Sequence, residues 1–206
     1  MKLLTLNDSY LIARGWHRQC YQHPDHEDRC IKIVVNGDDT ETKREQAYYR
    51  LLEKRLQDWR SVPRFHGNVD TTLGQGAVFD LVRDYDGKIS KTLADYIEQE
   101  REFNQYAPVL MTAMFNLIDY QLKHNVLTMS LKPKNLLFQV LADGDGVMHI
   151  IDNLGNSDWI PLCTYSHFFG QQKIRRKWKK FLTMLEKRHL NRPDLMYMFK
   201  SLETSL

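Results

Sequence analysis

The first eighty residues consist of short apolar runs separated by polar turns, a pattern typical of β-strands. Strands are expected over residues 3–12, 19–22, 29–35, 64–69 and 75–82. Between the third and fourth, apolar residues instead recur at i, i+3 and i+4, which predicts an amphipathic helix over residues 41–59. That helix carries Tyr48, Leu51, Leu52, Leu56 and Trp59 on one face. The first part of the chain is therefore expected to form an antiparallel sheet with one main helix.

After residue 83 the apolar spacing becomes mostly helical. Helices are expected over residues 92–101, 108–124 and most of the last third. Two β-prone runs, residues 138–141 and 147–151, flank Asp143-Gly-Asp-Gly146, which predicts a hairpin. The fold class is thus α+β, with a sheet and one helix in residues 1–83, a flexible hinge at 84–87, and a helical part over 88–206.

Composition places the chain among ordinary globular proteins, with 42% hydrophobic and 27% charged residues. Cys20, Cys30 and Cys163 are far apart and form no C-x-x-C pair, which favours reduced thiols in a cytoplasm over a zinc site or disulfide framework. The apolar stretch near the start is broken by Asn7 and Asp8 and is too short for a signal peptide. No apolar run approaches the ~20 residues of a membrane-spanning helix. We therefore expect a cytoplasmic protein without a transmembrane segment.

Two segments of the second half carry candidate chemistry. Thr128-Met-Ser-Leu-Lys-Pro-Lys-Asn135 follows an apolar run, and Asp152-Asn-Leu-Gly155 follows the predicted hairpin. Their order and spacing parallel the protein-kinase catalytic loop H-R-D-L-K-P-x-N and the metal-binding D-F-G. Ser130 stands where the catalytic aspartate of a kinase is expected.

Weaker signals of the same kind lie in the first part. Gly15 and Arg18 occupy the second and third glycine positions of the pattern G-x-G-x-x-G-x-V, so one of three glycines is present. Lys32 interrupts a β-branched strand, and Glu45 lies one turn before Tyr49 on the predicted helix. Each also has a plain structural interpretation: a turn glycine, an outward lysine and a solvated glutamate.

Taken together, these motifs resemble the parts of a protein-kinase fold in their order, and the sequence closely resembles the bacterial YrbL-type family, described as part of the PhoP regulatory network. The resemblance covers nearly the whole chain. It implies a two-lobed protein-kinase-like fold whose helical C-terminal lobe is truncated. The residues that carry it are Arg29–Val34, Asp58-Trp59, Pro63-Arg64, His66-Gly67, Thr128–Asn135, Asp152-Asn153, Gly155, Ile160–Leu162 and Trp178–Phe181.

The resemblance also implies roles in binding ATP. Lys32 would contact the α- and β-phosphates and be held by Glu45. Gly15 and its neighbours would cover the phosphates, with residues 80–86 beside the adenine. Arg18, at a glycine position, would either fill the phosphate pocket or bind phosphate directly.

For catalysis, the resemblance implies that Asn135 and Asp152 hold magnesium (Mg²⁺) against the phosphates. Lys132 would neutralise the transferred phosphoryl group. Ser130 is no base at neutral pH. General-base catalysis contributes about 10²–10⁴-fold, whereas phosphoryl transfer depends chiefly on positioning and electrostatics. The leading expectation is therefore a slow, atypical phosphotransferase.

Its acceptor would be a small molecule or envelope precursor, because only about fifty residues follow Asp152 and the platform for protein substrates is truncated. The alternative is a pseudokinase, a nucleotide-responsive module that regulates a protein partner.

A weaker alternative rests on a basic run near the end of the chain. Six bases surround an apolar helical face: Lys173, Arg175, Arg176, Lys177, Lys179 and Lys180. Such a run suits an anionic partner, either nucleic acid or an anionic membrane surface. The plain interpretation is that these bases are the solvated faces of a core helix.

Overall fold

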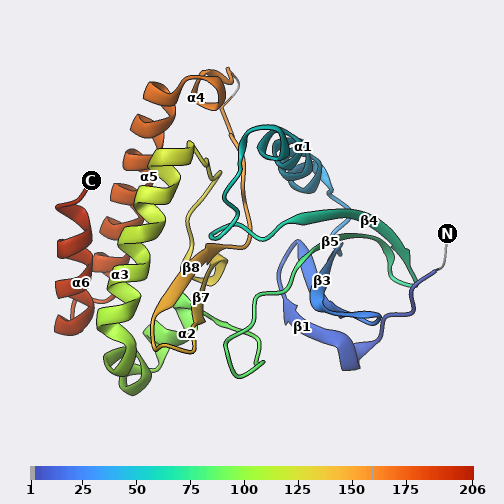
Figure 1. Ribbon diagram of the computed structural model, residues 1–206, viewed down its shortest axis with the longest axis horizontal. Helices are drawn as coiled ribbons and strands as arrows, with labels where there is room; N and C mark the ends of the chain where they lie inside the picture. The colour runs from blue at the N-terminus through green and yellow to red at the C-terminus, as the bar shows by residue number, and fades with distance from the viewer. Residues whose placement is uncertain (1–2, 159) are drawn as a thin grey trace. The chain divides into compact units, whose positions relative to one another are not determined.

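The computed structural model describes residues 3–158 and 160–206. The chain forms two compact units, residues 1–83 and residues 84–206. The first unit is an antiparallel sheet with one helix, and the second is mostly helical (Figure 1). The α+β class predicted from the sequence is confirmed.

The sheet of the first unit has five antiparallel strands in the order β1-β2-β3-β5-β4. Their bounds are Leu11–Arg14 for β1, Arg18–His23 for β2, His26–Val34 for β3, Phe65–Thr71 for β4 and Gly74–Asp80 for β5. The helix α1 spans Thr40–Arg55. The predicted number of strands and the single helix are confirmed for this unit.

The prediction of one continuous strand over residues 3–12 is wrong. Leu4 forms only an isolated parallel bridge with Thr71, and a short 3-10 helix, η1 (Asp8–Tyr10), precedes β1. The carboxamide oxygen of Asn7 accepts hydrogen bonds from the backbone N–H and the hydroxyl of Ser9, at 2.9 and 2.6 Å. This local turn competes with strand pairing and ends the extended run.

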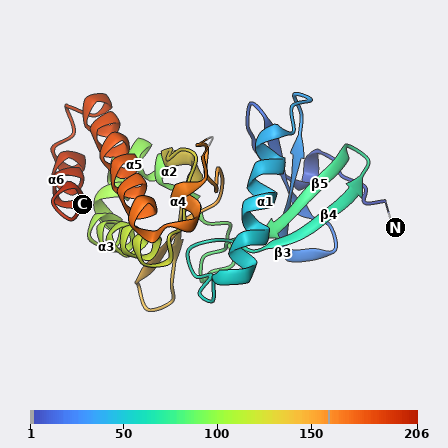
Figure 2. The same cartoon turned by 90° about the horizontal axis from the view of Figure 1, so that it is seen from above.

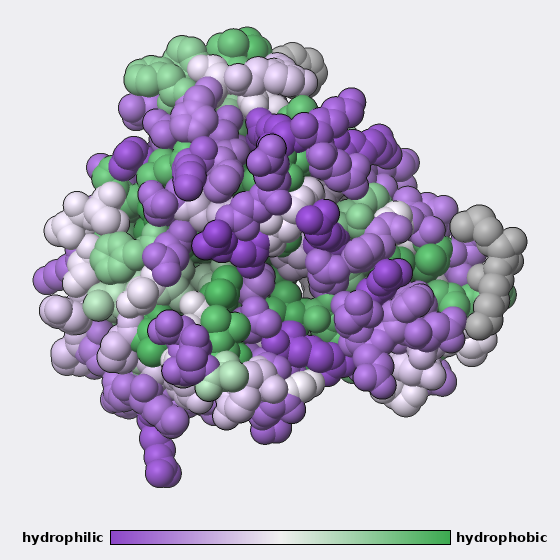
Figure 3. Space-filling view, viewed as in Figure 1, coloured by the Kyte–Doolittle hydropathy of each residue, from purple (hydrophilic) through white to green (hydrophobic). Residues whose placement is uncertain are grey.

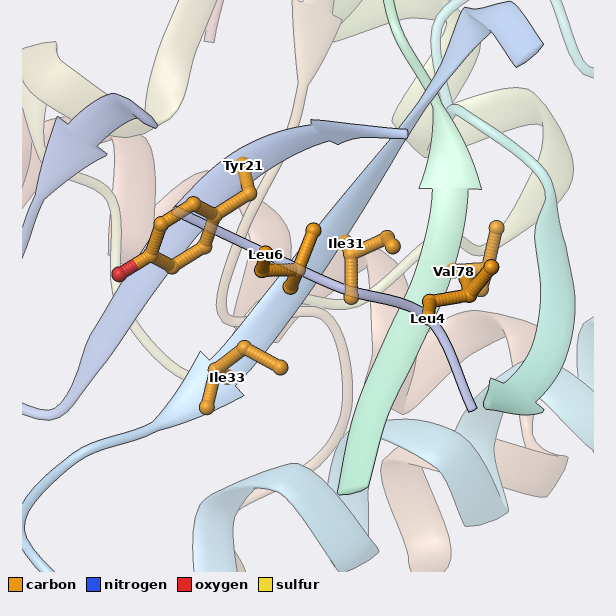
Figure 4. Close-up of a cluster of buried hydrophobic side chains, with 6 residues drawn as sticks. All are labelled: Leu4, Leu6, Tyr21, Ile31, Ile33 and Val78. Atoms are coloured by element: carbon orange, nitrogen blue, oxygen red, sulfur yellow. The ribbon is translucent and has the colours of Figure 1, made fainter. Parts of the chain in front are cut away.

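One face of the sheet is covered by the N-terminal segment. Ile31 and Ile33 of β3 pack with Tyr21 of β2 and Val78 of β5, and Leu4 and Leu6 cross over them (Figure 4). All six side chains are at most 7% exposed. Because side chains alternate along a strand, Cys30 and Lys32 of β3 point to the opposite face.

That opposite face is covered by α1 (Figure 2). Tyr49 of α1 is 1% exposed, and its ring lies 5.3 Å from that of Phe79 on β5 and 5.9 Å from that of Phe65 on β4. The helix ends at Arg55, four residues before the predicted Trp59. Trp59 nevertheless stacks on Tyr49 from an irregular segment, at 6.3 Å. The apolar spacing thus continued past the end of the helix.

The second unit contains three short strands and several helices. In chain order these are β6 (Lys91–Thr92), α2 (Leu93–Glu98), α3 (Glu100–His124), η2 (Pro133–Asn135), β7 (Leu136–Val140), β8 (Gly146–Ile150), α4 (Leu162–Tyr165), α5 (His167–Arg188) and α6 (Pro193–Glu203). The predicted hairpin is confirmed, since β7 and β8 pair antiparallel. Strand β6, which adds to β7, was not predicted.

Helix α3 begins at Glu100, eight residues before the predicted start at Pro108. Proline inside a helix removes one backbone hydrogen bond. The first turns persist because Phe103 is fully buried. Helices α3, α5 and α6 lie side by side (Figure 1). In residues 3–158 and 160–206, no helix has both the length and the apolar character to cross a membrane.

The β2–β3 hairpin carries a buried histidine that should make stability depend on pH. His23 is 7% exposed, and its Nδ1 accepts a hydrogen bond from the backbone N–H of Asp25 at 3.1 Å. Burial, and then the charge of His26, lowers the pKa of His23 below its ordinary 6.5. The unfolded chain therefore binds a proton more readily. Stability from neutral His23 is complete above pH 6.5 and is lost as the pH falls through the folded pKa.

We therefore expect the urea midpoint to fall between pH 7.5 and pH 5, and to fall less in His23→Asn. Asparagine keeps an acceptor for Asp25 but does not titrate. Burial also lowers the pKa of His189, which remains in both proteins, so the informative quantity is the difference between their slopes. Equal slopes would contradict the assignment to His23.

Candidate functional site

The loop over residues 128–135 is tied by backbone hydrogen bonds to the segment that carries Asp152. The N–H of Met129 donates to the carbonyl of Asn153 at 2.7 Å, and that of Gly155 donates to Leu127 at 2.9 Å. The N–H of Ile151 donates to the carbonyl of Asn135 at 3.0 Å. Asn135 and Asp152 therefore lie on two segments that are fixed to each other.

Asn135 is the most informative side chain of this region. It ends η2 and is 5% exposed. Its side-chain amide forms no hydrogen bond with the rest of the described chain, and the Nδ2 atom is fully buried. A buried polar group without a partner is rare and costs about 1–3 kcal/mol. Because Nδ2 is a donor, it points to a ligand with an acceptor oxygen, such as a phosphate, and Oδ1 of the same amide remains available to a metal ion.

An amide oxygen and a carboxylate, from Asn135 and Asp152, suit magnesium, which prefers hard oxygen ligands and keeps several waters. Among residues 3–158 and 160–206, no group of three or more His, Cys, Asp or Glu side chains could hold a metal ion. Asn135 and Asp152 supply two hard oxygen donors, and any further ligands of such an ion would have to be other oxygen groups, such as phosphate or water.

Ser130 and Lys132 lie on the same loop. Ser130 is half-buried and Lys132 is exposed. Within the part of the chain that the structure describes, neither side chain has a hydrogen bond or ion pair, so both can meet a ligand.

Two lysines of helix α5 hold the 128–135 loop and the segment that follows Asp152. The ammonium of Lys177 donates to the carbonyl of Met129 at 2.5 Å. Lys173 donates to Asn156 and forms an ion pair with Asp158 at 2.8 Å. The hydrogen bond from Lys173 lowers the pKa of the Asp158 carboxyl, and burial lowers the pKa of Lys177. Two bases of the run thus anchor the segments on either side of the candidate site.

This arrangement corrects the prediction of an anionic partner along the whole basic run. Lys173 is 3% exposed, and Arg175 donates to the main-chain oxygen of Leu206. Arg176, Lys179 and Lys180 remain exposed. The supporting roles of Lys173 and Lys177 were missed. One feature of the sequence indicates these roles. Lys173 and Lys177 are four residues apart, one helical turn, and lie next to the apolar face that carries Ile174 and Trp178.

The first unit brings three charged side chains together on the face under α1, where Glu45 is buried and Arg18 and Lys32 are half-buried. Glu45 is 1% exposed, and its Oε2 lies 2.6 Å from Nη1 of Arg18, whose side chain is 12% exposed. The ammonium of Lys32 lies 4.6 Å from the centre of the Phe79 ring. Burial and the charge of Arg18 lower the pKa of Lys32, and Glu45 opposes that shift. The three side chains therefore influence one another electrostatically.

Glu45 thus points inward rather than into solvent, and Arg18 is an ion-pair partner that the sequence did not predict. Gly15 lies in the turn between β1 and β2, where its N–H donates to the carbonyl of Arg18 at 2.9 Å. A Cβ atom on Gly15 would lie 2.7 Å from that oxygen. The turn itself therefore requires glycine, and a role in covering phosphates stays a prediction.

The structure thus groups Arg18, Lys32 and Glu45 within the first unit, with Gly15 in the adjoining turn. It groups Ser130, Lys132, Asn135 and Asp152 within the second.

Comparison with known proteins gives a consistent family match. A family model described as "PhoP regulatory network protein YrbL" matches residues 4–186. The chain is 39% identical over 183 residues to "Uncharacterized protein YrbL" of Escherichia coli (strain K12), which covers 87% of each protein. A protein of the same name from Shigella flexneri matches equally well. Neither name states an activity.

Proposed function

This chain belongs to the YrbL family of PhoP regulatory network proteins, and we propose that it is a kinase-like protein that binds Mg·ATP. The observation that carries the proposal is the buried amide of Asn135, which has no partner in the described chain and lies on a segment fixed to that of Asp152. Asn135 and Asp152 would hold the magnesium ion, with phosphate oxygens and water as the other ligands.

The three-charge group of the first unit supports the same proposal. Lys32 would contact the phosphates, and its lowered pKa fits a lysine that is stabilised when an anion binds. Arg18 is engaged by Glu45, so it would orient that carboxylate rather than fill the phosphate pocket. The proposed fold is a two-lobed, protein-kinase-like one.

The proposed reaction is slow phosphoryl transfer. The bond from the γ-phosphorus to ADP breaks as a bond to an acceptor hydroxyl forms, and the hydroxyl proton passes to water. Lys132, exposed and unpaired among the described residues, would offset the charge of the transferring group. Ser130 cannot take the proton, which costs about 10²–10⁴-fold in rate. The acceptor would be a small molecule or an envelope precursor.

The second candidate is a pseudokinase, which binds nucleotide and regulates a partner without turnover. The observation that favours it is Ser130 itself, because the loop offers no carboxylate at the position of the catalytic base. Both candidates require the same nucleotide site, so one experiment tests them together and a second separates them.

We expect ATP with Mg²⁺ to raise the melting temperature by about 5–10 °C when ATP is at a hundred times its dissociation constant. Asp152→Asn and Lys32→Met should each remove this shift, because they remove a metal ligand and a phosphate contact. Asp145→Asn, in the exposed β7–β8 turn, is the matched control and should keep it. No shift in the unaltered protein would exclude nucleotide binding.

Labelled ATP then divides the candidates. Formation of ADP or a labelled product that Asp152→Asn abolishes identifies a phosphotransferase. Binding of ATP without turnover, when the protein itself and a small-molecule extract are each offered as acceptors, identifies a pseudokinase.

A further inference from the structure

An exposed apolar cluster extends from Ile160, just before α4, through α4 to the first turn of α5. Its five members, called the apolar tip below, are Ile160 (63% exposed), Leu162 (56%), Tyr165 (76%), Phe168 (64%) and Phe169 (48%). Figure 3 shows hydrophobic atoms gathered at the top of the view, over this part of the second unit. Contiguous apolar surface of this kind marks a site of interaction.

The apolar tip continues into positive charge along α5. Phe169, Arg176 and Lys180 are spaced i, i+7 and i+11, which places them on one face of the helix, and Lys179 follows Phe168 at the same i+11 spacing. Arg176, Lys179 and Lys180 are exposed and form the basic stripe of this surface. The sequence has no Asp or Glu between Asp158 and Glu186, and Asp158 is paired with Lys173. The stripe therefore keeps its positive charge.

We propose that the apolar tip and the basic stripe dock on an anionic lipid bilayer. Aromatic and aliphatic side chains at the tip would enter the boundary between headgroups and acyl chains, and the arginine and lysines would lie beside lipid phosphates. This combination of inserted apolar residues with adjacent bases is what peripheral binding to a charged bilayer requires.

The chemistry of the surface favours a bilayer over other partners. Nucleic acid would use the aromatic rings for base stacking, but Ile160 and Leu162 offer no ring to stack on. A symmetric contact with a second copy would bring the basic stripe against itself, because an isologous interface uses the same patch twice. An anionic bilayer offers an apolar boundary to the aliphatic side chains and phosphate groups to the bases.

The test is co-sedimentation of the full chain with vesicles of phosphatidylcholine alone and with vesicles that also contain phosphatidylglycerol. Binding is expected only to the anionic vesicles and should weaken with added salt. Arg176→Gln/Lys179→Gln/Lys180→Gln should lower the partition coefficient roughly a hundredfold, since each base beside an anionic surface contributes about fivefold. Phe168→Ser/Phe169→Ser should lower it roughly tenfold or more.

The matched control is Tyr197→Ser/Lys200→Gln, an exposed aromatic and base on α6, which should bind like the unaltered protein. Unchanged melting temperatures confirm that the variants fold. Absence of binding, equal binding to neutral vesicles, or binding that the α5 variants leave intact would overturn the proposal. So would preferential binding to single-stranded RNA in competition with the vesicles, or a dimer that Phe168→Ser/Phe169→Ser disperses. Nucleotide binding has no part in these outcomes.

Discussion

Glu45→Gln is expected to destabilise the first unit by about 3–5 kcal/mol, because it breaks a buried ion pair by removing one partner. The Glu45 side chain is 1% exposed and that of Arg18 is 12% exposed, so water screens the pair little. The substitution leaves the charges of Arg18 and Lys32 close together without the carboxylate that offsets them. It should also lower the pKa of Lys32 further, since Glu45 raises it. Urea denaturation followed by far-UV circular dichroism measures the loss.

Two further variants isolate the cause. Arg18→Met/Glu45→Leu removes both charges and keeps apolar bulk, and buried pairs replaced in this way often lose little stability. Lys43→Ala breaks the exposed pair of Lys43 with Asp39, and should change stability by less than about 1 kcal/mol. A loss below about 1 kcal/mol in Glu45→Gln would show that Arg18 and Glu45 are not coupled in the way that their distance indicates.

Most of the fold follows from local periodicity. The β3 strand, the α1 helix and the β7–β8 hairpin were predictable because hydrophobic residues repeat every two residues in a strand and every 3.6 in a helix. Such a repeat is recognisable within a few residues. The errors lie where a local side chain overrides that period. Asn7 breaks the first predicted strand through its hydrogen bonds with Ser9. Buried Phe103 extends α3 on the N-terminal side of Pro108.

The positions of the candidate residues in the fold were partly predictable, and their contacts were less so. The inward position of Glu45 follows from its spacing to Tyr49, since residues i and i+4 share a helix face. Its contact with Arg18 depends on how α1 packs on the sheet, which the sequence pattern does not encode. Lys173 is a second example. The sequence shows that it belongs to a run of six bases, but only the fold shows that it is buried and paired with Asp158.

Trp178→Ala is expected to cost the second unit about 3–5 kcal/mol, the usual effect of truncating a large buried aromatic side chain. Trp178 is fully buried on α5, and its indole N–H donates to Oε1 of Gln121 on α3 at 2.7 Å. Gln121 in turn donates to the carbonyl of Val126 at 2.8 Å, where the chain enters the candidate site loop. The substitution therefore removes apolar packing and also loosens the start of that loop. Urea denaturation by circular dichroism measures the first effect.

Trp178→Phe keeps most of the ring and removes only the N–H group, so it should cost about 1–3 kcal/mol, the penalty for leaving the buried oxygen of Gln121 without a donor. If Trp178→Ala fails to fold, this variant still tests the hydrogen bond. Trp178→Phe/Gln121→Met removes both polar partners but also leaves the fully buried carbonyl of Val126 without its donor, so it should be no more stable than Trp178→Phe. Because the same chain of contacts ends at the loop, Trp178→Phe should also weaken the Mg·ATP-dependent rise in melting temperature. A variant as stable as the unaltered protein would contradict the role assigned to this hydrogen bond.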